Sequence, residues 1–325
     1  MMKATMVQAL NQALAQEMAR DERFVLLGED VGLDGGVFRV TDGLIQKFGA
    51  DRVMDTPLAE SGLVGVAIGM AAFGLLPIVE IQFLGFIYPA FNQILSHVAR
   101  LRNRTRGRYP MPLVIRTPYG AGVRALEHHS ESTEALFCQL PGLTVVVPST
   151  PHDAKGLLIA SLRSEEPVIF LEPSRLYRAE KQEVPDEPYE IPLREARIVR
   201  EGADLTLIGW GAMVPVMEKA AEAAEGRGVA AEILDLRTLA PLDRETILAS
   251  VRKTGRAVVV HEAPKTCGLG AEISALIAEN ALLNLQAPVL RVTGQDIPIP
   301  LPKTEDYYYV NPGRVLAGIL KTMEF

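Results

Sequence analysis

Short apolar runs alternate with segments of helical periodicity along almost the whole chain, and one charged, proline-rich segment at 180–192 interrupts them. Runs such as Phe24–Gly28 are apolar throughout, which is typical of strands buried on both faces of a parallel sheet. The helical segments between them predict helices that cover both faces. We therefore expect an α/β fold of two tandem parallel-sheet sandwiches. The first domain is predicted over 1–180, the linker over 181–196 and the second domain over 197–325.

Composition and charge narrow the function classes. The chain has 325 residues, of which 48% are hydrophobic and 22% charged, as in globular proteins. Its net charge of −7 argues against nucleic acid as the main partner, because neutralising phosphates needs a basic surface. The basic run Arg100–Arg108 is interpreted as a solvated helix end, although a contact with an acidic partner or a phosphate stays open.

The uncharged run from Ser61 to Val79 is long enough to raise the question of a membrane span. Its glycines and Pro77 favour a tightly packed buried helix, a turn at Gly74 and a core strand instead, so we expect no membrane contact. The two cysteines, Cys138 and Cys267, have no metal or redox spacing, which fits plain core thiols in a reducing cytoplasm.

Glu60 is the first candidate for chemistry. It stands directly before the uncharged run, at a predicted helix start where free backbone N–H groups favour negative charge. An apolar wall beside a carboxyl raises its pKa toward the range that suits proton transfer. The alternative is that Glu60 only complements the helix dipole, as many acids at helix starts do.

A glycine-rich loop from Pro118 to Ser130 ends in His128–His129, just beyond a predicted strand. Sites of α/β folds lie at this edge, and an imidazole suits proton transfer, although the pair could equally be solvated surface residues. A dinucleotide-binding fingerprint is incomplete, because Val214 stands at the third glycine position after Gly209-Trp-Gly211. An NAD-binding oxidoreductase is thus a weak alternative.

Five short motifs occur together in order, and together they resemble the beta subunit of the decarboxylating component of 2-oxo acid dehydrogenase complexes. The resemblance covers essentially the whole chain. The motifs are Gly28-Glu-Asp-Val-Gly32, Asp55-Thr-Pro-Leu-Ala-Glu60, Glu80-Ile-Gln-Phe83, His129-Ser130 and Leu234-Asp-Leu-Arg-Thr238.

The resemblance implies a transketolase-like pyrimidine-binding domain followed by a transketolase C-terminal domain. It implies thiamine diphosphate as cofactor, shared with an alpha chain in an α2β2 heterotetramer. Glu60 would hydrogen-bond the ring nitrogen of the aminopyrimidine, with Leu58 and Phe86 lining it and Gln82 close by. His129 would orient the substrate and assist acyl transfer to a lipoyl group, with His128 only its neighbour.

The family's Gly-Asp-Gly motif for diphosphate and Mg²⁺ does not occur in this sequence. Mg²⁺ prefers oxygen ligands that include a carboxylate, so the alpha chain is expected to supply most of the Mg²⁺ ligands. Related proteins also bind a monovalent cation such as K⁺. The corresponding positions are Leu113, Ser161, Leu162, Ser164 and Glu166, where Ser164 and Glu166 replace the usual Asp and Asn.

For the substrate, the segments 82–86 and 118–132 resemble pyruvate-type more than branched-chain subunits, which leaves 2-oxoisovalerate as the alternative. The resemblance also implies that the C-terminal domain docks on a dihydrolipoyl acyltransferase core, with Lys321–Phe325 as a candidate contact. A non-catalytic scaffold of the same fold is the remaining alternative, and the presence of Glu60 and His129 argues against it.

Overall fold

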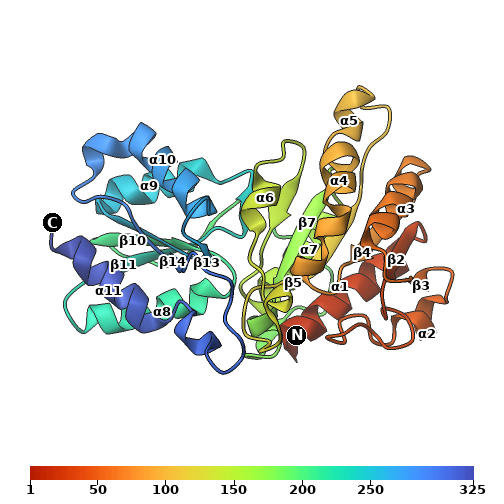
Figure 1. Ribbon diagram of the computed structural model, residues 1–325, viewed down its shortest axis with the longest axis horizontal. Coiled ribbons are helices and arrows are strands. Elements are labelled where there is room, and N and C mark those ends of the chain that lie inside the picture. The colour runs from red at the N-terminus through yellow and green to blue at the C-terminus, as the bar shows by residue number, and fades with distance from the viewer.

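Two sheets with helices on both faces lie side by side in the computed structural model, which describes residues 1–325 (Figure 1). The larger sheet has seven strands in the order β12-β6-β7-β5-β4-β2-β3, and all but β12 are parallel. Its strands from the first half of the chain are β2 (Phe24–Gly28), β3 (Val53–Asp55), β4 (Leu76–Glu80), β5 (Val114–Tyr119), β6 (Thr144–Val146) and β7 (Val168–Pro173).

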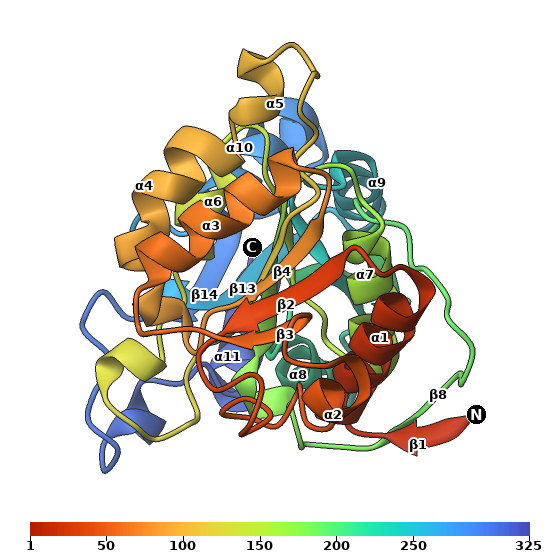
Figure 2. The same cartoon turned by 90° about the vertical axis from the view of Figure 1, so that its right-hand side faces the viewer.

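Helices α1 (Met6–Arg20) and α7 (Pro151–Leu162) cover one face of this sheet, and α3 (Glu60–Ala72) and α4 (Phe91–Gln93) cover the other (Figure 2). The alternation of side chains along a strand sets this arrangement. On β2, Phe24 and Leu26 join the apolar cluster under α1 and α7, whereas Val25 and Leu27 join the cluster under α3. Helix α1 begins at Met6, where Thr5 and Gln8 form a capping box.

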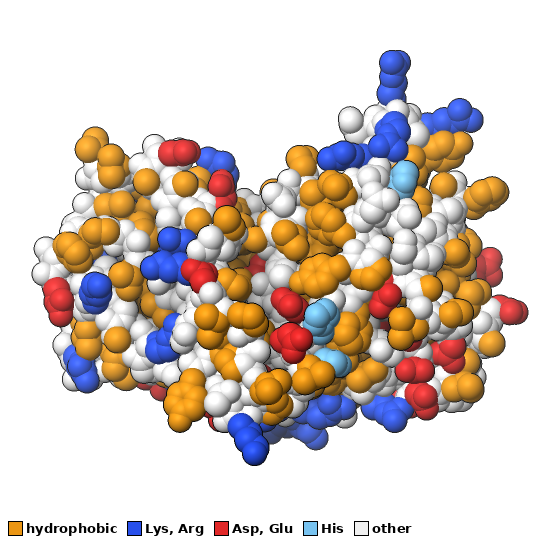
Figure 3. Space-filling model, viewed as in Figure 1, with side chains coloured by type: hydrophobic (Ala, Val, Ile, Leu, Met, Phe, Trp, Pro, Cys, Tyr) orange, Lys and Arg blue, Asp and Glu red, His pale blue; other side chains and the backbone are white.

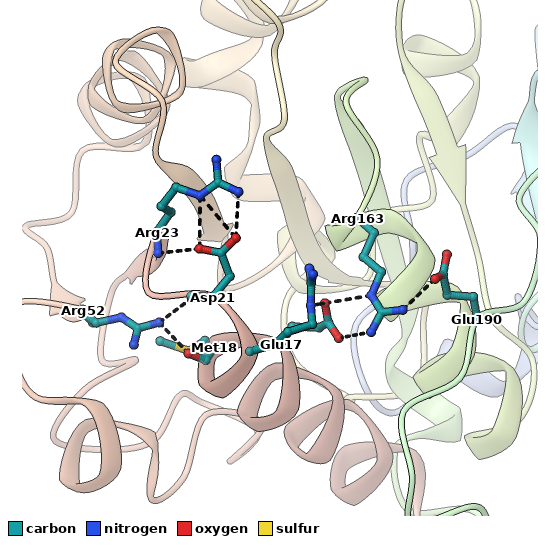
Figure 4. Close-up of polar contacts among 8 residues, drawn as sticks. Glu17, Met18, Asp21, Arg23, Arg52, Arg163 and Glu190 are labelled. Atoms are coloured by element: carbon teal, nitrogen blue, oxygen red, sulfur yellow. Dashed lines mark hydrogen bonds and ion pairs between the residues drawn. The ribbon is translucent and has the colours of Figure 1, made fainter.

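A buried acid, Glu17, fastens α1 to α7. Its carboxylate is fully buried and accepts two hydrogen bonds from Arg163, at 3.0 and 2.7 Å. Arg20 adds a third at 2.8 Å, and Arg163 also reaches Glu190 in the crossing segment at 2.6 Å (Figure 4). The pairing satisfies a carboxylate that would be costly to bury alone.

The second sheet has the order β14-β13-β10-β11-β9. Helices α8 (Met213–Glu225) and α11 (Pro312–Met323) cover one face, and α9 (Arg244–Thr254) and α10 (Leu269–Ala281) cover the other (Figure 1). Its strands are β9 (Arg197–Arg200), β10 (Leu205–Gly209), β11 (Ala231–Asp235), β13 (Ala257–Pro264) and β14 (Leu290–Gly294).

The two sheets share structure that the alternation did not predict. Strand β12 (Thr238–Ala240) follows β11 of the second sheet along the chain, but it pairs antiparallel with β6 at the edge of the first sheet. The apolar cluster under α3 continues without a break to Trp210, Ile247 and Ile273 of the second half. In the predicted linker, β8 (Gln182–Val184) pairs with β1 (Met2–Ala4). The α/β architecture is therefore confirmed, with the halves joined by a strand and a common core.

The segment Tyr88–Arg104 is not one regular helix, because it consists of a 3₁₀ turn at Tyr88–Ala90, α4, a π-helical segment at Ile94–Val98 and α5 (Leu101–Arg104). One helix prediction needs correction. The helix expected to be buried, α3, packs only one side. Its other side exposes Gly62, Val66 and Gly69. The sequence could not predict this, because a helix that is apolar on all sides does not indicate which side packs against the rest of its chain. No helix of this structure has the length and apolarity needed to cross a membrane.

Candidate functional site

The predicted site residues gather at the carboxyl edge of the first sheet. Glu60 is the first residue of α3, directly after β3, while Gln82 follows β4 and the histidine loop follows β5. These strands are parallel, so their carboxyl ends meet at one edge, as in other α/β sites. The arrangement follows from the alternation alone.

Glu60 is buried, with 8% of its surface exposed. Its helix has no side-chain cap at Ala59, so backbone N–H groups of the first turn remain free near the carboxyl. Asp55 shapes the neighbouring loop, because its carboxylate accepts the N–H of Gly32 at 2.6 Å and of Leu33 at 3.1 Å. The acid is thus held at a helix start beside an ordered loop.

Glu29 is a second carboxyl of this site that we did not predict. Burial raises the pKa of Glu29, and the neighbouring carboxylates of Glu60 and Asp30 raise it further. Glu29 lies in the motif Gly28–Gly32, so the signal was present in the sequence. Paired acids of this kind are suited to holding and exchanging a proton.

Leu58 and Gln82 differ in how far they are exposed to solvent. Leu58 is 79% exposed, so it can contact only a ligand or a partner that approaches from outside this chain's core. Gln82 is half-buried, and its Nε2 donates to Asp30 Oδ2 at 3.0 Å, which ties β4 to the loop after β2.

An aromatic cluster holds His129. The imidazole lies edge-on to Phe83, with ring centroids 4.6 Å apart, and to Phe86, at 5.1 Å. Its Nδ1 is buried without a hydrogen-bond partner. His128 is exposed, with Nδ1 3.7 Å from Glu127. The structure therefore distinguishes the two histidines, and it brings His129 and Phe86 together.

Unpaired polar atoms continue along the chain after His129. Ser130 Oγ, Thr133 Oγ1 and both carboxyl oxygens of Glu134 are buried without partners, and burial raises the pKa of Glu134 to about 7. Such groups are rare in folded proteins and mark functional segments. In Figure 3, histidine and acidic side chains gather near the boundary between the two lobes.

Gly85 sets the distance between the aromatic cluster and the histidine loop. A Cβ at this position would clash with the carbonyl oxygen of His128 and lie 3.0 Å from Glu131 Cγ. We expect Gly85→Ala to displace the loop and to lower any activity that depends on His129 roughly tenfold to a hundredfold, since small displacements of a site are costly. Gly226→Ala is the matched control, because its Cβ would meet only Ala223 O at 3.6 Å. Equal effects of both changes on that activity would contradict this prediction.

The residues suggested for a monovalent cation offer it no free carboxylate, so that site stays a prediction that depends on backbone carbonyls. The carboxylate of Glu166 is bound by two guanidinium groups, Arg102 at 3.2 Å and Arg194 at 2.9 Å. The carbonyl of Leu113 accepts the N–H of Val168, and Ser161 Oγ donates to Leu157 O. Leu162 and Ser164 supply no further carboxylate. The carboxylate of Glu166 is therefore already paired with two guanidinium groups.

Comparisons with known proteins agree with this geometry. The family model described as the transketolase pyrimidine-binding domain matches residues 2–180, and that of the transketolase C-terminal domain matches residues 194–315. The chain is 53% identical over 317 residues to a pyruvate dehydrogenase E1 component subunit beta of Acholeplasma laidlawii, which covers 98% of this chain and 97% of the relative. Counterparts from Staphylococcus epidermidis and Bacillus subtilis are each 50% identical over the full length of both chains.

A solved structure confirms the fold independently. A split-gene transketolase, described as an inactive beta4 tetramer, superposes with a TM-score of 0.81 at 23% identity over 99% of both chains. At that identity the likeness supports the architecture of the two sheets and nothing about activity.

Proposed function

The chain belongs to the family of pyruvate dehydrogenase E1 component beta subunits, and from this membership we propose that it is the beta half of a thiamine-diphosphate-dependent pyruvate dehydrogenase. The enzyme decarboxylates pyruvate and transfers the acetyl group to a lipoyl carrier. The observation that carries the proposal is the buried Glu60 at the carboxyl edge of the first sheet. The 50% identity to relatives over the full length of the chain supports it.

We propose that the first domain, 1–180, holds the pyrimidine half of the cofactor, and that 181–196 and 197–325 are the linker and the second domain. The residues present fit an aminopyrimidine, since they offer a buried carboxyl and apolar side chains at one edge. Thiamine diphosphate, when bound, supplies the electron sink that decarboxylation needs. Glu60 would exchange a proton with the ring nitrogen of the aminopyrimidine, while Leu58 and Phe86 would line its faces and Gln82 would fix the loop nearby.

His129 serves the second half of the reaction in this proposal. Its imidazole is held by Phe83 and Phe86, which leaves the ring little freedom and lets it meet the acyl group in a fixed orientation. Its Nδ1 is buried and has no hydrogen-bond partner within this chain.

We propose that an alpha chain completes the site in an α2β2 assembly in the cytoplasm and contributes most of the Mg²⁺ and diphosphate ligands. Two features support this. The sequence has no Gly-Asp-Gly, and no group of three or more His, Cys, Asp or Glu side chains is arranged to hold a metal ion. The face of α3 that bears Gly62, Val66 and Gly69 is open next to Glu60, where another chain can pack closely. The second domain would then dock on the acyltransferase core.

Calorimetric titration tests the divided site. Thiamine diphosphate with Mg²⁺ is expected to bind the mixture of this chain and its alpha partner and not this chain alone. The loaded assembly is then compared on pyruvate and 2-oxoisovalerate, with pyruvate expected to react faster. Tight binding to the isolated chain would contradict the divided site, and faster turnover of 2-oxoisovalerate would move the enzyme to the branched-chain class.

A further inference from the structure

The glycine-rich end of the histidine loop is bound to the second domain as well as to its own. The N–H of Gly122 donates to Glu305 Oε1 at 2.9 Å, and Arg124 Nη2 contacts both oxygens of Asp306, at 2.8 and 3.0 Å. Glu305 and Asp306 belong to a 3₁₀ turn, Glu305–Tyr307, that lies more than 180 residues further along the chain.

Close packing strengthens the same contact. Gly120 has φ +83°, and a Cβ there would lie 2.7 Å from Glu262 Oε2, at the end of β13. A Cβ on Gly122, at φ +118°, would clash with Arg175 Cγ. Only glycine adopts these backbone angles without strain, so the loop can follow this path against the second domain.

Arg175 and Glu305 link these contacts into one unit. Arg175 Nη1 lies 3.4 Å from Glu262 Oε1, and its guanidinium stacks over the ring of Tyr309, 4.7 Å from the centroid. The Tyr309 hydroxyl donates to Glu305 Oε1, the same oxygen that accepts the N–H of Gly122. Glu305 is fully buried, so its hydrogen bonds are charge-assisted in a low dielectric.

The loop connects these contacts to His129. The N–H of Gly120 donates to the carbonyl of Glu131 at 2.9 Å, which closes the loop two residues after His129. On the opposite side the loop rests on Gly85. The loop that carries His129 is therefore held between Gly85 of the first domain and Glu262, Glu305 and Asp306 of the second.

We propose that Glu305 and Asp306 are positioning residues, through which the second domain sets the place of His129 during acyl transfer. The inference rests on the proposed function, because it assigns these residues to the step that His129 serves. Neither residue touches the aromatic cluster or Glu60, so their effect is on the loop. Decarboxylation, which Glu60 serves, should be insensitive to them.

Exchanging the charges of the exposed ion pair Arg124–Asp306 tests the positioning role most directly. Asp306→Arg places a second cation beside Arg124. In the alpha–beta assembly it is expected to lower reductive acylation of a free lipoyl domain about fivefold to tenfold. Pyruvate decarboxylation, measured with an artificial electron acceptor, should stay within about twofold of the unmodified rate. Combining it with Arg124→Asp restores an opposite pair and should recover most of the acylation. Glu305→Gln should lower acylation about tenfold, because it weakens a buried charge-assisted bond.

Glu225→Gln is the matched control, since Arg200 and Glu225 form an ion pair of 2.8 Å in the same half of the chain, away from the loop. It should change neither half-reaction. Hydrogen exchange over residues 118–133 should quicken in Asp306→Arg and return to the unmodified rate in the double variant. Unchanged acylation and exchange in all variants of an active assembly would overturn the positioning role alone. An unmodified assembly that does not decarboxylate pyruvate would instead overturn the proposed function.

Discussion

Replacing Glu60 with glutamine is expected to lower pyruvate decarboxylation by the alpha–beta assembly by about 10²–10⁴-fold, the range that a positioned acid–base group contributes. Glutamine keeps the size and the hydrogen-bonding shape of the side chain but cannot give up or take a proton. The carboxyl is buried at the start of α3, so solvent offers no ready substitute. Steady-state decarboxylation with saturating thiamine diphosphate and Mg²⁺ measures the loss.

A second acid at a helix start separates catalysis from helix stabilisation. Glu245 lies in the first turn of α9 and is exposed, so Glu245→Gln removes the same favourable interaction with a helix dipole, worth about 0.3–1 kcal/mol. Both variants should lose a similar small amount of stability, and only Glu60→Gln should lose activity. Activity of Glu60→Gln within about twofold of the unmodified assembly would sink the acid–base role and favour the scaffold alternative.

The first sheet and its functional edge could be predicted because both depend on local pattern. Parallel pairing is predicted by continuous apolar runs such as Phe24–Gly28 with helices between them. Because the strands are parallel, Glu60 and the histidine loop lie at one edge of the sheet. Strand β12 could not be predicted in this way. Its three residues show no pattern of their own, and its partner β6 lies about 90 residues earlier in the chain.

The parts of the site that sequence reasoning missed depend on contacts between distant segments. Nothing near Glu305 indicates that its carboxylate accepts the N–H of Gly122, because that bond exists only when the two domains meet. The raised pKa of Glu29 likewise depends on where the end of β2 lies relative to the start of α3, because Glu60 is one of its causes. Leu58 shows the converse, since an apolar residue that the resemblance assigns to the cofactor pocket is exposed in this chain.

Arg116 was also missed, because a lone arginine in an apolar strand gives no signal of its partners. It lies on β5 with 1% of its surface exposed, and its Nε and Nη2 donate to the two oxygens of Glu172 at 2.7 Å each. Nη1 donates to Glu80 on the adjacent strand β4, and the Tyr177 hydroxyl donates to Glu172 at 2.5 Å. One guanidinium therefore hydrogen-bonds two buried carboxylates inside the first sheet.

The largest loss of stability is expected from Arg116→Met, which leaves Glu80 and Glu172 buried without a positive partner. Breaking such a cluster by removing one member costs about 3–5 kcal/mol, because the remaining charges keep their desolvation penalty. Glu80 lies at the end of β4, two residues before Gln82, and its Oε1 would be 3.0 Å from a Cβ on Gly36. Disorder there would reach the functional edge, so activity should fall along with stability.

Urea denaturation of the purified chain measures this change. Arg200→Met is the control, since its ion pair with the largely exposed Glu225 should contribute less than about 1 kcal/mol. Replacing the whole cluster, with Arg116→Met, Glu80→Leu and Glu172→Leu together, should recover most of the loss, because apolar side chains of similar volume can replace a buried ion cluster. A triple variant as unstable as Arg116→Met would show that lost packing around the strand, rather than unpaired charge, is the cause. An Arg116→Met variant as stable as Arg200→Met would mean that the cluster does not hold β4 and β5 together.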